Sequence, residues 1–473
     1  MIVRVLIATM LICMTYSARA DSDEWSGLQT DLERMAHDAS VPAMGLVIMD
    51  DYRPAVVQTF GENVTTATPF RWGSISKTFT ALGLLRLVEQ RRVELDDLLQ
   101  DHVPPGVFAN AWSTNHPVLL KHLLELTAGF SDLSGSEFNQ NQPMSLKQAL
   151  ALNPTSRVTH WPPGLQHNYS NLTPGLTSVV IEHVSGVAFE EFMDEQVLAP
   201  LSMPNASFLP LANLPGGFKA DGRTEIPYWQ MTFRAFGALN ASVREMSRFL
   251  SALLNDGVLD DNRVLDQQTL LSLYRPQTSL GVAAGLEVAY AAGMYSWVSK
   301  SHVFYGHGGD ADGYRSRYGL LPDSGRGYLI VINTDNPRLL RSLQRRIESE
   351  LTLDLDKPIP HPAVWVSSET LASYTGVYYP AAARFGVSRW QSGELDTIDI
   401  SLRADKLLYT RGRRQVTLIP LGDDRFRREN DPVTTVVFVR DANGAMFIQG
   451  ELGNFAKIDA SPCAGFINAC DSQ

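Results

Sequence analysis

The sequence predicts an α+β fold, in which an antiparallel sheet carries a helical insertion and a small antiparallel β domain follows at the C-terminal end. Three observations support this prediction. Strand-like segments occur near residue 50 and again near residue 320, the segments between them have the apolar spacing of helices, and short alternating segments dominate after residue 374. At 473 residues, the chain is long enough for a large domain and a smaller companion.

The elements at the two ends of the first domain are predicted to share one sheet. Near the start, a helix is expected at residues 28–36 and two strands at 43–49 and 55–60, joined by the turn-forming residues 50–54. Far downstream, three further strands are expected at 303–306, 314–321 and 328–333, and a helix at 338–351. Strands from both ends can complete one antiparallel sheet only if the intervening chain leaves it and returns.

That intervening chain has mostly helical periodicity. We expect helices at residues 77–89, 119–126, 173–183, 189–196 and 243–254, with long loops between them. A helical insertion packed beside a sheet leaves a cleft between the two parts.

A change of pattern separates the second domain from the first. Alternating Pro358, Pro360 and Pro362 stiffen the chain and cannot continue a helix, which predicts a linker at residues 357–366. Alternating segments at 397–402, 407–410, 416–419 and 434–439 then predict a small antiparallel sheet or barrel. The expected organisation is a main domain at 21–356, the linker, and a β-rich domain at 367–473.

The first twenty residues are typical of a secretory signal peptide. A basic start at Met1 to Arg4 precedes an apolar run and the small-residue pattern Ala18-Arg19-Ala20. We expect cleavage after residue 20 and a periplasmic or secreted protein, with a retained N-terminal anchor as the alternative. No later segment approaches the roughly 20 apolar residues of a membrane helix, so no membrane span is expected after cleavage.

Net charge, cysteine content and histidine spacing limit the binding partners and cofactors that we expect for this protein. The formal net charge of −11 argues against nucleic acid and against an anionic membrane surface as partners. After cleavage, Cys463 and Cys470 would be the remaining cysteines, and in an oxidising compartment they are expected to form a disulfide. The histidines are scattered and His-Glu-x-x-His is absent, so neither a metal nor another cofactor is expected. The oligomeric state is left open.

Ser74-Ile75-Ser76-Lys77 stands at the start of the predicted helix 77–89. Three-residue spacing places Ser74 and Lys77 on one helical face, so the amine can reach the hydroxyl. A serine hydroxyl is a poor nucleophile, and a desolvated, partly neutral lysine can remove its proton. Because such a pair occurs by chance about once in a chain of this length, the accompanying motifs decide its value.

Tyr169-Ser170-Asn171 follows the turn-forming Pro162-Pro163-Gly164 and precedes a predicted helix, which places it on a loop. A phenol such as Tyr169 can relay a proton between lysine, serine and a leaving group. The Asn171 carboxamide can orient the lysine or hold a substrate amide.

His307-Gly308-Gly309 follows the predicted strand 303–306 and precedes Asp310. Positions without a side chain let a substrate approach the backbone and align as an extra strand. A main-chain N–H beyond the glycines would complete an oxyanion hole with that of Ser74. His307, Gly309 and Asp310 are therefore candidate substrate-binding residues.

In this order, the three motifs resemble the signatures of the class C β-lactamase and penicillin-recognising serine hydrolase superfamily, which includes D-alanyl-D-alanine carboxypeptidases, D-aminopeptidases and related esterases. The likeness extends over roughly residues 25 to 350 and includes further segments at 70–73, 122–130, 163–164, 239–242 and 313–316. It implies a β-lactamase/transpeptidase-like fold for the main domain. By the same resemblance, Ser74 is the nucleophile, Lys77 the general base, Tyr169 a proton relay, Asn171 a positioning group and His307 a substrate-side residue.

One position departs from the β-lactamase and carboxypeptidase pattern. Those enzymes usually carry lysine where this chain has His307, and a histidine is mostly neutral near pH 7, so it offers a substrate carboxylate no fixed charge. The His-Gly-Gly triplet looks more like the D-aminopeptidases and some esterases of the superfamily, and those D-aminopeptidases also carry β-rich C-terminal domains.

The sequence therefore predicts an exported serine hydrolase that forms an acyl-enzyme on Ser74 with a small peptide, amide, ester or β-lactam substrate. A lipase-like α/β hydrolase is excluded, because no serine has glycine at both flanking positions of a Gly-x-Ser-x-Gly elbow. A penicillin-binding sensor or scaffold, which acylates without efficient turnover, remains the alternative.

Overall fold

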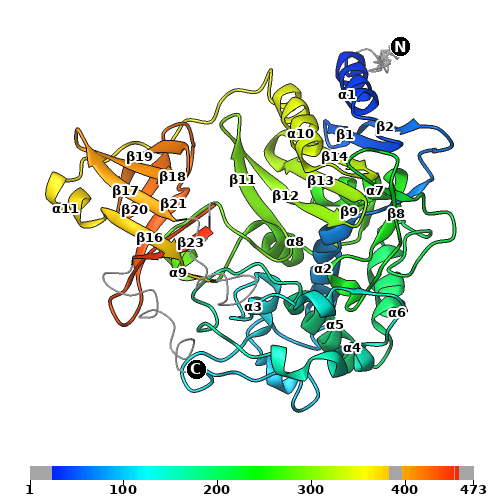
Figure 1. Ribbon diagram of the computed structural model, residues 1–473, viewed down its shortest axis with the longest axis horizontal. Helices are drawn as coiled ribbons and strands as arrows, with labels where there is room; N and C mark the ends of the chain where they lie inside the picture. Colours follow the sequence, from blue (N-terminus) through cyan, green and yellow to red (C-terminus); the bar gives the residue numbers. More distant parts are fainter. Residues whose placement is uncertain (1–23, 383–396, 452, 458–473) are drawn as a thin grey trace, which may run out of the picture.

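The computed structural model describes residues 24–382, 397–451 and 453–457 (Figure 1). The predicted signal peptide at 1–20 and the predicted Cys463–Cys470 disulfide lie outside the described residues. The described chain has the expected α+β architecture, with a mixed helix and sheet unit followed by an antiparallel β barrel.

The sheet joins strands from both ends of the main domain. Its order is β11-β12-β13-β14-β1-β2, and every neighbouring pair is antiparallel. The strands are β1 (Ala43–Asp50), β2 (Arg53–Gly61), β11 (Tyr295–Ser299), β12 (His302–Ala311), β13 (Tyr314–Leu321) and β14 (Arg326–Ile332). The prediction that the two ends share a sheet is confirmed. Strand β11 was not predicted, and β12 runs to Ala311, so the expected end at residue 306 was wrong.

Both faces of the sheet are covered, and the side chains of β1 alternate between two apolar clusters. Met44, Leu46 and Ile48 pack with α1 (Ser26–Asp38) and α10 (Pro337–Leu351). Ala43, Val47 and Met49 face the helical insertion. A strand buried on both faces has apolar residues at nearly every position, and β1 accordingly reads Ala-Met-Gly-Leu-Val-Ile-Met.

The helical insertion surrounds one central helix, α2 (Ser76–Glu89), which is buried along most of its length. All five predicted helices of the insertion are present, and α4, α8 and α9 are additional. The remaining helices are α3 (Leu120–Leu124), α4 (Leu146–Leu152), α5 (Leu172–Ser185), α6 (Phe189–Met193), α7 (Val243–Leu254), α8 (Gln267–Tyr274) and α9 (Leu280–Ala283).

Short strands tie the insertion together in small ladders. Their bounds are β3 (Pro69–Arg71) with β8 (Asn240–Ser242), β4 (Asn139–Gln140) with β7 (Gln230–Met231), β9 (Val258–Leu259) with β10 (Asn262–Arg263), and β5 (Gly217–Lys219) with β6 (Glu225–Ile226) and β15 (Thr334–Asp335). The β3/β8 ladder lies directly before the Ser74 turn, so it fixes the chain that enters α2.

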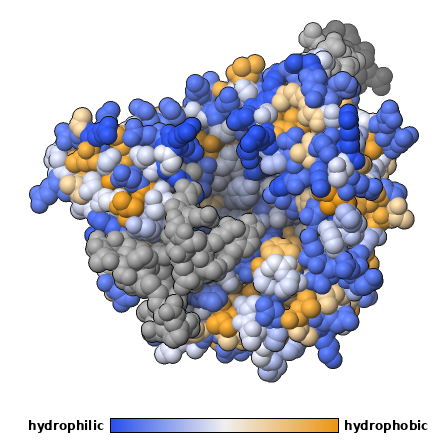
Figure 2. Space-filling view, in the orientation of Figure 1, coloured by the Kyte–Doolittle hydropathy of each residue, from blue (hydrophilic) through white to orange (hydrophobic). Residues whose placement is uncertain are grey.

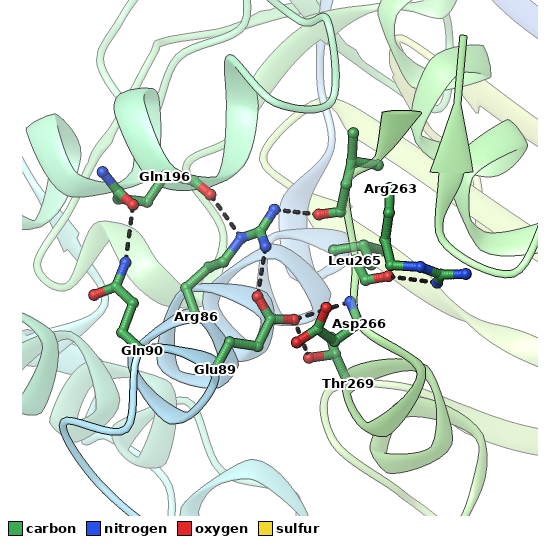
Figure 3. Close-up of polar contacts among 9 residues, drawn as sticks. Arg86, Glu89, Gln90, Gln196, Arg263, Leu265, Asp266 and Thr269 are labelled. Atoms are coloured by element: carbon green, nitrogen blue, oxygen red, sulfur yellow. Dashed lines mark hydrogen bonds and ion pairs between the residues drawn. The ribbon is translucent and has the colours of Figure 1, made fainter. Parts of the chain in front are cut away.

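The far end of α2 is anchored by two charged side chains (Figure 3). Arg86 donates to the carbonyl of Gln196 at 2.9 Å and pairs with Glu89 at 2.5 Å. Glu89 in turn accepts from the backbone N–H of Asp266 at 3.1 Å and from the Thr269 hydroxyl, at the start of α8. The network holds α2 between two neighbouring segments at the end opposite Ser74.

The C-terminal strands close into a barrel. Of the two predicted possibilities, an open sheet or a barrel, the structure has the barrel. The strands are β16 (Gly376–Pro380), β17 (Ile398–Arg403), β18 (Lys406–Arg411), β19 (Arg414–Gly422), β20 (Arg425–Arg428), β21 (Val436–Arg440), β22 (Met446–Gly450) and β23 (Gly453–Lys457), and β23 pairs back onto β16. Leu371 of the short helix α11 (Ser368–Ser373) joins Tyr378, Ile398 and Phe438 in the apolar interior. The interior is therefore a packed core.

Between the sheet unit and the barrel, residues 356–367 have no regular secondary structure, and Ile359 and Trp365 are 93% and 85% exposed. This stretch includes the predicted linker at 357–366. Figure 2 shows the surface hollowed between the barrel and the sheet unit. No helix among the described residues is long and apolar enough to cross a membrane.

Candidate active site

Ser74 and Lys77 lie within hydrogen-bonding distance at the start of α2. Ser74 sits in a single 3-10 turn, Gly73–Ile75, and Lys77 is in the first turn of the helix that follows. The Lys77 Nζ is 3.0 Å from the Ser74 Oγ, and the lysine is only 3% exposed. The predicted contact is therefore formed, with the lysine almost fully shielded from water.

The other contacts of Lys77 bear on its protonation state. Its Nζ donates to the Asn171 Oδ1 at 2.6 Å and to the Phe236 carbonyl at 3.0 Å. Both partners can only accept hydrogen bonds. An ammonium has three N–H groups, which match these two acceptors and the Ser74 Oγ, whereas a neutral amine has two N–H groups for the two acceptors and a lone pair for the hydroxyl proton. The geometry suits a lysine that takes the proton of Ser74.

Asn171 is itself oriented by Asp132, a residue that the motifs did not predict. The Asn171 backbone N–H donates to the Asp132 Oδ1 at 2.6 Å, and its Nδ2 donates to the Oδ2 at 3.1 Å. Asp132 is 7% exposed. Because the carboxylate accepts from the amide nitrogen, the amide oxygen must face Lys77. Only tertiary structure brings residues 132 and 171 together, so no local sequence signal could have found this pair.

Tyr169 lies beside the lysine. The Lys77 Nζ is 4.9 Å from the centre of the Tyr169 ring, and this ring lies 6.3 Å from that of His307 and 6.4 Å from that of Tyr290. The side chain lines the same cavity as Ser74. The structure therefore brings Ser74, Lys77, Tyr169 and Asn171 into one place.

Strand β12 passes directly behind the serine turn, and two glycines make this close approach possible. A Cβ on Gly309 would lie 1.8 Å from the Trp72 carbonyl oxygen. A Cβ on Gly73, which has φ +55°, would lie 2.8 Å from the backbone nitrogen of Asp310. The backbone of Asp310 is thus adjacent to that of Ser74, where the oxyanion hole is expected. Pairing of β11 with β12 ends at Gly306, so residues 307–311 pair with β13 on one side and have no strand partner among the described residues on the other side.

His307 is buried, at 1% exposure, and both of its ring nitrogens have partners. Nδ1 lies 2.5 Å from the Gly308 carbonyl, which can only accept, so Nδ1 carries a proton. Burial and the neighbouring Lys77 lower the His307 pKa to about 3. In this neutral ring Nε2 is an acceptor, and the Tyr290 hydroxyl donates to it at 3.0 Å. His307 lines the cavity, but it offers neither a positive charge nor an unengaged N–H to a substrate.

The cavity around these residues measures about 390 Å³. Part of its lining is charged: Arg315 pairs with Asp310 at 2.6 Å and also with Asp335, while Asp312 accepts from Asn139 at 2.7 Å. The lining consists of Ser74, Phe138, Asn139, Tyr169, Asn171, Met231, Phe236, Tyr295, His307, Gly308, Asp310, Ala311, Asp312, Arg315, Ser316, Arg317, Asp335 and Leu340. Among the described residues there is no cluster of histidine, cysteine and carboxylate side chains that could hold a metal ion.

The buried histidines predict how stability depends on pH. Burial, with a smaller contribution from Lys121, lowers the pKa of His122 to about 4, and the pKa of His307 is about 3. The unfolded chain takes up protons at both residues below about pH 6.5, while the folded chain does not. Each of these two histidines should therefore contribute a loss of about 2 kcal/mol to the free energy of unfolding when the pH falls from 7 to 5.

Urea denaturation at the two pH values measures this loss. In His122→Gln the loss between pH 7 and pH 5 should be smaller than in the wild type. His37→Gln, which changes an exposed histidine on α1, is the matched control. An equal pH dependence in His122→Gln and the wild type would contradict the prediction.

The family model named Beta-lactamase matches residues 28–352. This chain belongs to the β-lactamase family. The match covers the sheet unit and its helical insertion, so the predicted superfamily resemblance is confirmed.

Relatives of known sequence are distant. "Protein flp" of Staphylococcus aureus strain MRSA252 is 23% identical over 347 residues, which are 70% of this chain and 67% of that protein. A protein named "Beta-lactamase" from Yersinia enterocolitica is 26% identical over 223 residues, which are 45% of this chain and 55% of that protein.

Solved structures support the fold of most of the chain. The octameric penicillin-binding protein homologue from Pyrococcus abyssi has a TM-score of 0.56 at 19% identity and covers 91% of this chain and 99% of its own. The structure of SurE has a TM-score of 0.59 at 22% identity, and the match covers 93% of this chain and 100% of the SurE chain. The β-lactamase/D-alanine carboxypeptidase from Yersinia pestis has a TM-score of 0.55 at 20% identity, and the match covers 69% of this chain and 98% of that enzyme's chain. The first two matches cover more of this chain than the family match does, so they include residues of the barrel.

Proposed function

We propose that this protein is an exported serine hydrolase that forms an acyl-enzyme on Ser74 with amide or ester substrates. The observation that carries the proposal is the position of the Lys77 Nζ, 3.0 Å from the Ser74 Oγ and held by two acceptor oxygens. A base oriented in this way activates a hydroxyl nucleophile. The case for export rests on residues 1–20, and a disulfide between Cys463 and Cys470 is proposed with it.

The reaction begins when Lys77 takes the proton of Ser74 as the Oγ attacks the substrate carbonyl carbon. The carbonyl oxygen becomes an oxyanion, which accepts hydrogen bonds from the backbone N–H groups of Ser74 and Asp310. Tyr169 passes the proton to the leaving nitrogen or oxygen as the carbonyl carbon separates from it. Attack by water on the acyl-Ser74 ester, with the proton transfers reversed, releases the acid and restores Ser74.

The state of His307 bears on the choice of substrate. A neutral imidazole whose two nitrogens are engaged cannot anchor a substrate carboxylate by charge. We therefore expect esters and simple amides to be better substrates than compounds whose carboxylate needs a fixed cation at this position. Penicillins are such compounds, because the related enzymes that bind them usually carry lysine there.

Covalent labelling and substrate profiling test the proposal. A fluorophosphonate should add one adduct, and peptide mapping by mass spectrometry should place it on Ser74. Turnover should be measured with a p-nitrophenyl ester, a D-amino amide, D-Ala-D-Ala and nitrocefin, and we expect the ester and the D-amino amide to be the better substrates. An adduct on another residue, or no adduct, would contradict the proposal. Acylation of Ser74 without turnover of any compound would instead indicate a penicillin-binding sensor.

A further inference from the structure

The barrel packs against the segment that leads from α9 into the active site. Small and apolar side chains of the barrel, at Ala381, Val437, Val439, Phe447 and Ala456, form one buried cluster with Leu286, against which Leu280, Ala284 and Ala289 pack. Beside it, the Thr434 N–H donates to the Glu287 carboxylate at 2.8 Å, and the Glu287 N–H donates to the Thr434 carbonyl at 3.1 Å. The next residues along this segment include Tyr290, which donates to His307.

Gln449 of strand β22 forms two hydrogen bonds across this interface, one through the oxygen and one through the nitrogen of its side-chain amide. Its Oε1 accepts from the Gly281 N–H at 2.6 Å, and its Nε2 donates to the Leu165 carbonyl at 3.0 Å. The side chain is 1% exposed. A buried amide needs hydrogen-bond partners, and here those partners belong to two different segments of the other unit. Gln449 therefore fastens α9 and the loop at residue 165 to each other.

Asn454 of strand β23 stands directly opposite Gln449 in the barrel register. Its Nδ2 donates to the carbonyl of His167. The His167 ring in turn stacks on that of Tyr290, with ring centres 5.2 Å apart. The side-chain amides of Gln449 and Asn454 thus donate to the carbonyls of Leu165 and His167, two residues apart in the loop that leads to Tyr169.

The loop at residues 164–171 is held from two sides. Its second half is bonded to the helical insertion, where Asn168 donates to Phe130 and Asn171 to Asp132. Its first half is bonded to α9 by the Ser279 and Leu280 N–H groups, at 2.9 and 3.0 Å, and to the barrel by the two amides. Tyr169 stands two residues after His167, where the two supports meet.

We propose that Gln449 and Asn454 are positioning residues, through which the C-terminal barrel fixes the loop that carries Tyr169. The inference rests on the proposed function, because Tyr169 is assigned there as the proton relay. Proton transfer requires donor and acceptor within hydrogen-bonding distance, and a displacement of about 1 Å can cost about a hundredfold in rate. The barrel then contributes to acylation without contacting the substrate.

The test compares Gln449→Met, Asn454→Leu and the double variant in the full chain, with Gln415→Met as the matched control. Gln415 is an exposed barrel glutamine whose amide bonds to Thr410 within the barrel at 3.2 Å. In single-turnover acylation by a p-nitrophenyl ester, the double variant should lose about a hundredfold in the maximal rate, while its half-saturating concentration stays within about twofold. The control should acylate at the wild-type rate.

Hydrogen exchange gives a second readout that does not depend on activity. The double variant should exchange backbone amides of residues 164–171 about ten times faster than the wild type, with unchanged exchange in α2. Unchanged exchange in this loop would overturn the positioning role, as would a loss of acylation no larger than the loss of folded protein measured by thermal unfolding. If Ser74 is not the nucleophile, the exchange result still decides the positioning role, so the two failures are distinguishable.

Discussion

Ser74→Ala should abolish both turnover and covalent labelling by a fluorophosphonate or a fluorescent penicillin. The substitution removes the Oγ that lies 3.0 Å from the Lys77 Nζ, which is the atom proposed to form the acyl bond. We expect at least a thousandfold loss of turnover, on the order of what removal of a catalytic nucleophile costs. In-gel fluorescence and a turnover assay measure the two effects.

Ser76 provides the matched control for this prediction. Its hydroxyl is buried, donates to the Gly73 carbonyl at 2.7 Å and accepts from the Leu239 N–H at 2.9 Å. Ser76→Ala should therefore lower the stability of the turn and still be labelled on Ser74. Labelling that survives in Ser74→Ala would remove Ser74 from the mechanism.

Lys77→Ala and Tyr169→Phe should each slow acylation by about a hundredfold to ten-thousandfold, and the double variant should be little slower than the worse single one. The expected size is that of a lost general acid or base. The losses should not add, because two residues that transfer the same proton act as a unit. Single-turnover acylation of the four proteins forms a double-mutant cycle that measures the coupling.

Lys77→Arg tests whether residue 77 acts as a base or only through its positive charge. A guanidinium keeps a positive charge and remains protonated, so it cannot take the proton of Ser74. We expect this variant to acylate as slowly as Lys77→Ala. Near-wild-type acylation by Lys77→Arg, or strictly additive losses for Lys77→Ala and Tyr169→Phe, would refute a shared proton path.

The sequence was sufficient to predict those parts of the site that depend on local geometry. The three-residue spacing of Ser74 and Lys77 in one helical turn is a property of the helix itself, and the structure places the two side chains in contact. Asp132 and the Phe236 carbonyl belong to the same cluster, yet neither carries a motif. Both reach Lys77 or Asn171 through packing between segments far apart in the chain.

Strand β12 shows why the boundary of a predicted element can be wrong. Gly306, Gly308 and Gly309 have low strand propensity, so the sequence pattern ends the strand early. In the structure, pairing with β13 continues to Ala311. The barrel illustrates a similar limit. Alternation predicts its strands, but closure depends on pairing of β16 with β23, which lie about 75 residues apart.

The side of β12 that faces away from β13 and lacks a strand partner at residues 307–311 has a consequence for contacts with other molecules. Exposed backbone N–H and C=O groups along a strand invite pairing with a strand of another molecule, which is a common route to aggregation. Here residues 307–311 open into a cavity of about 390 Å³ whose wall includes Phe138, Tyr169 and Met231. We expect a cavity of this size to admit a single extended segment beside the edge more readily than the sheet of a neighbouring protein. The side chains that line this cavity therefore also limit the access of another strand to the edge.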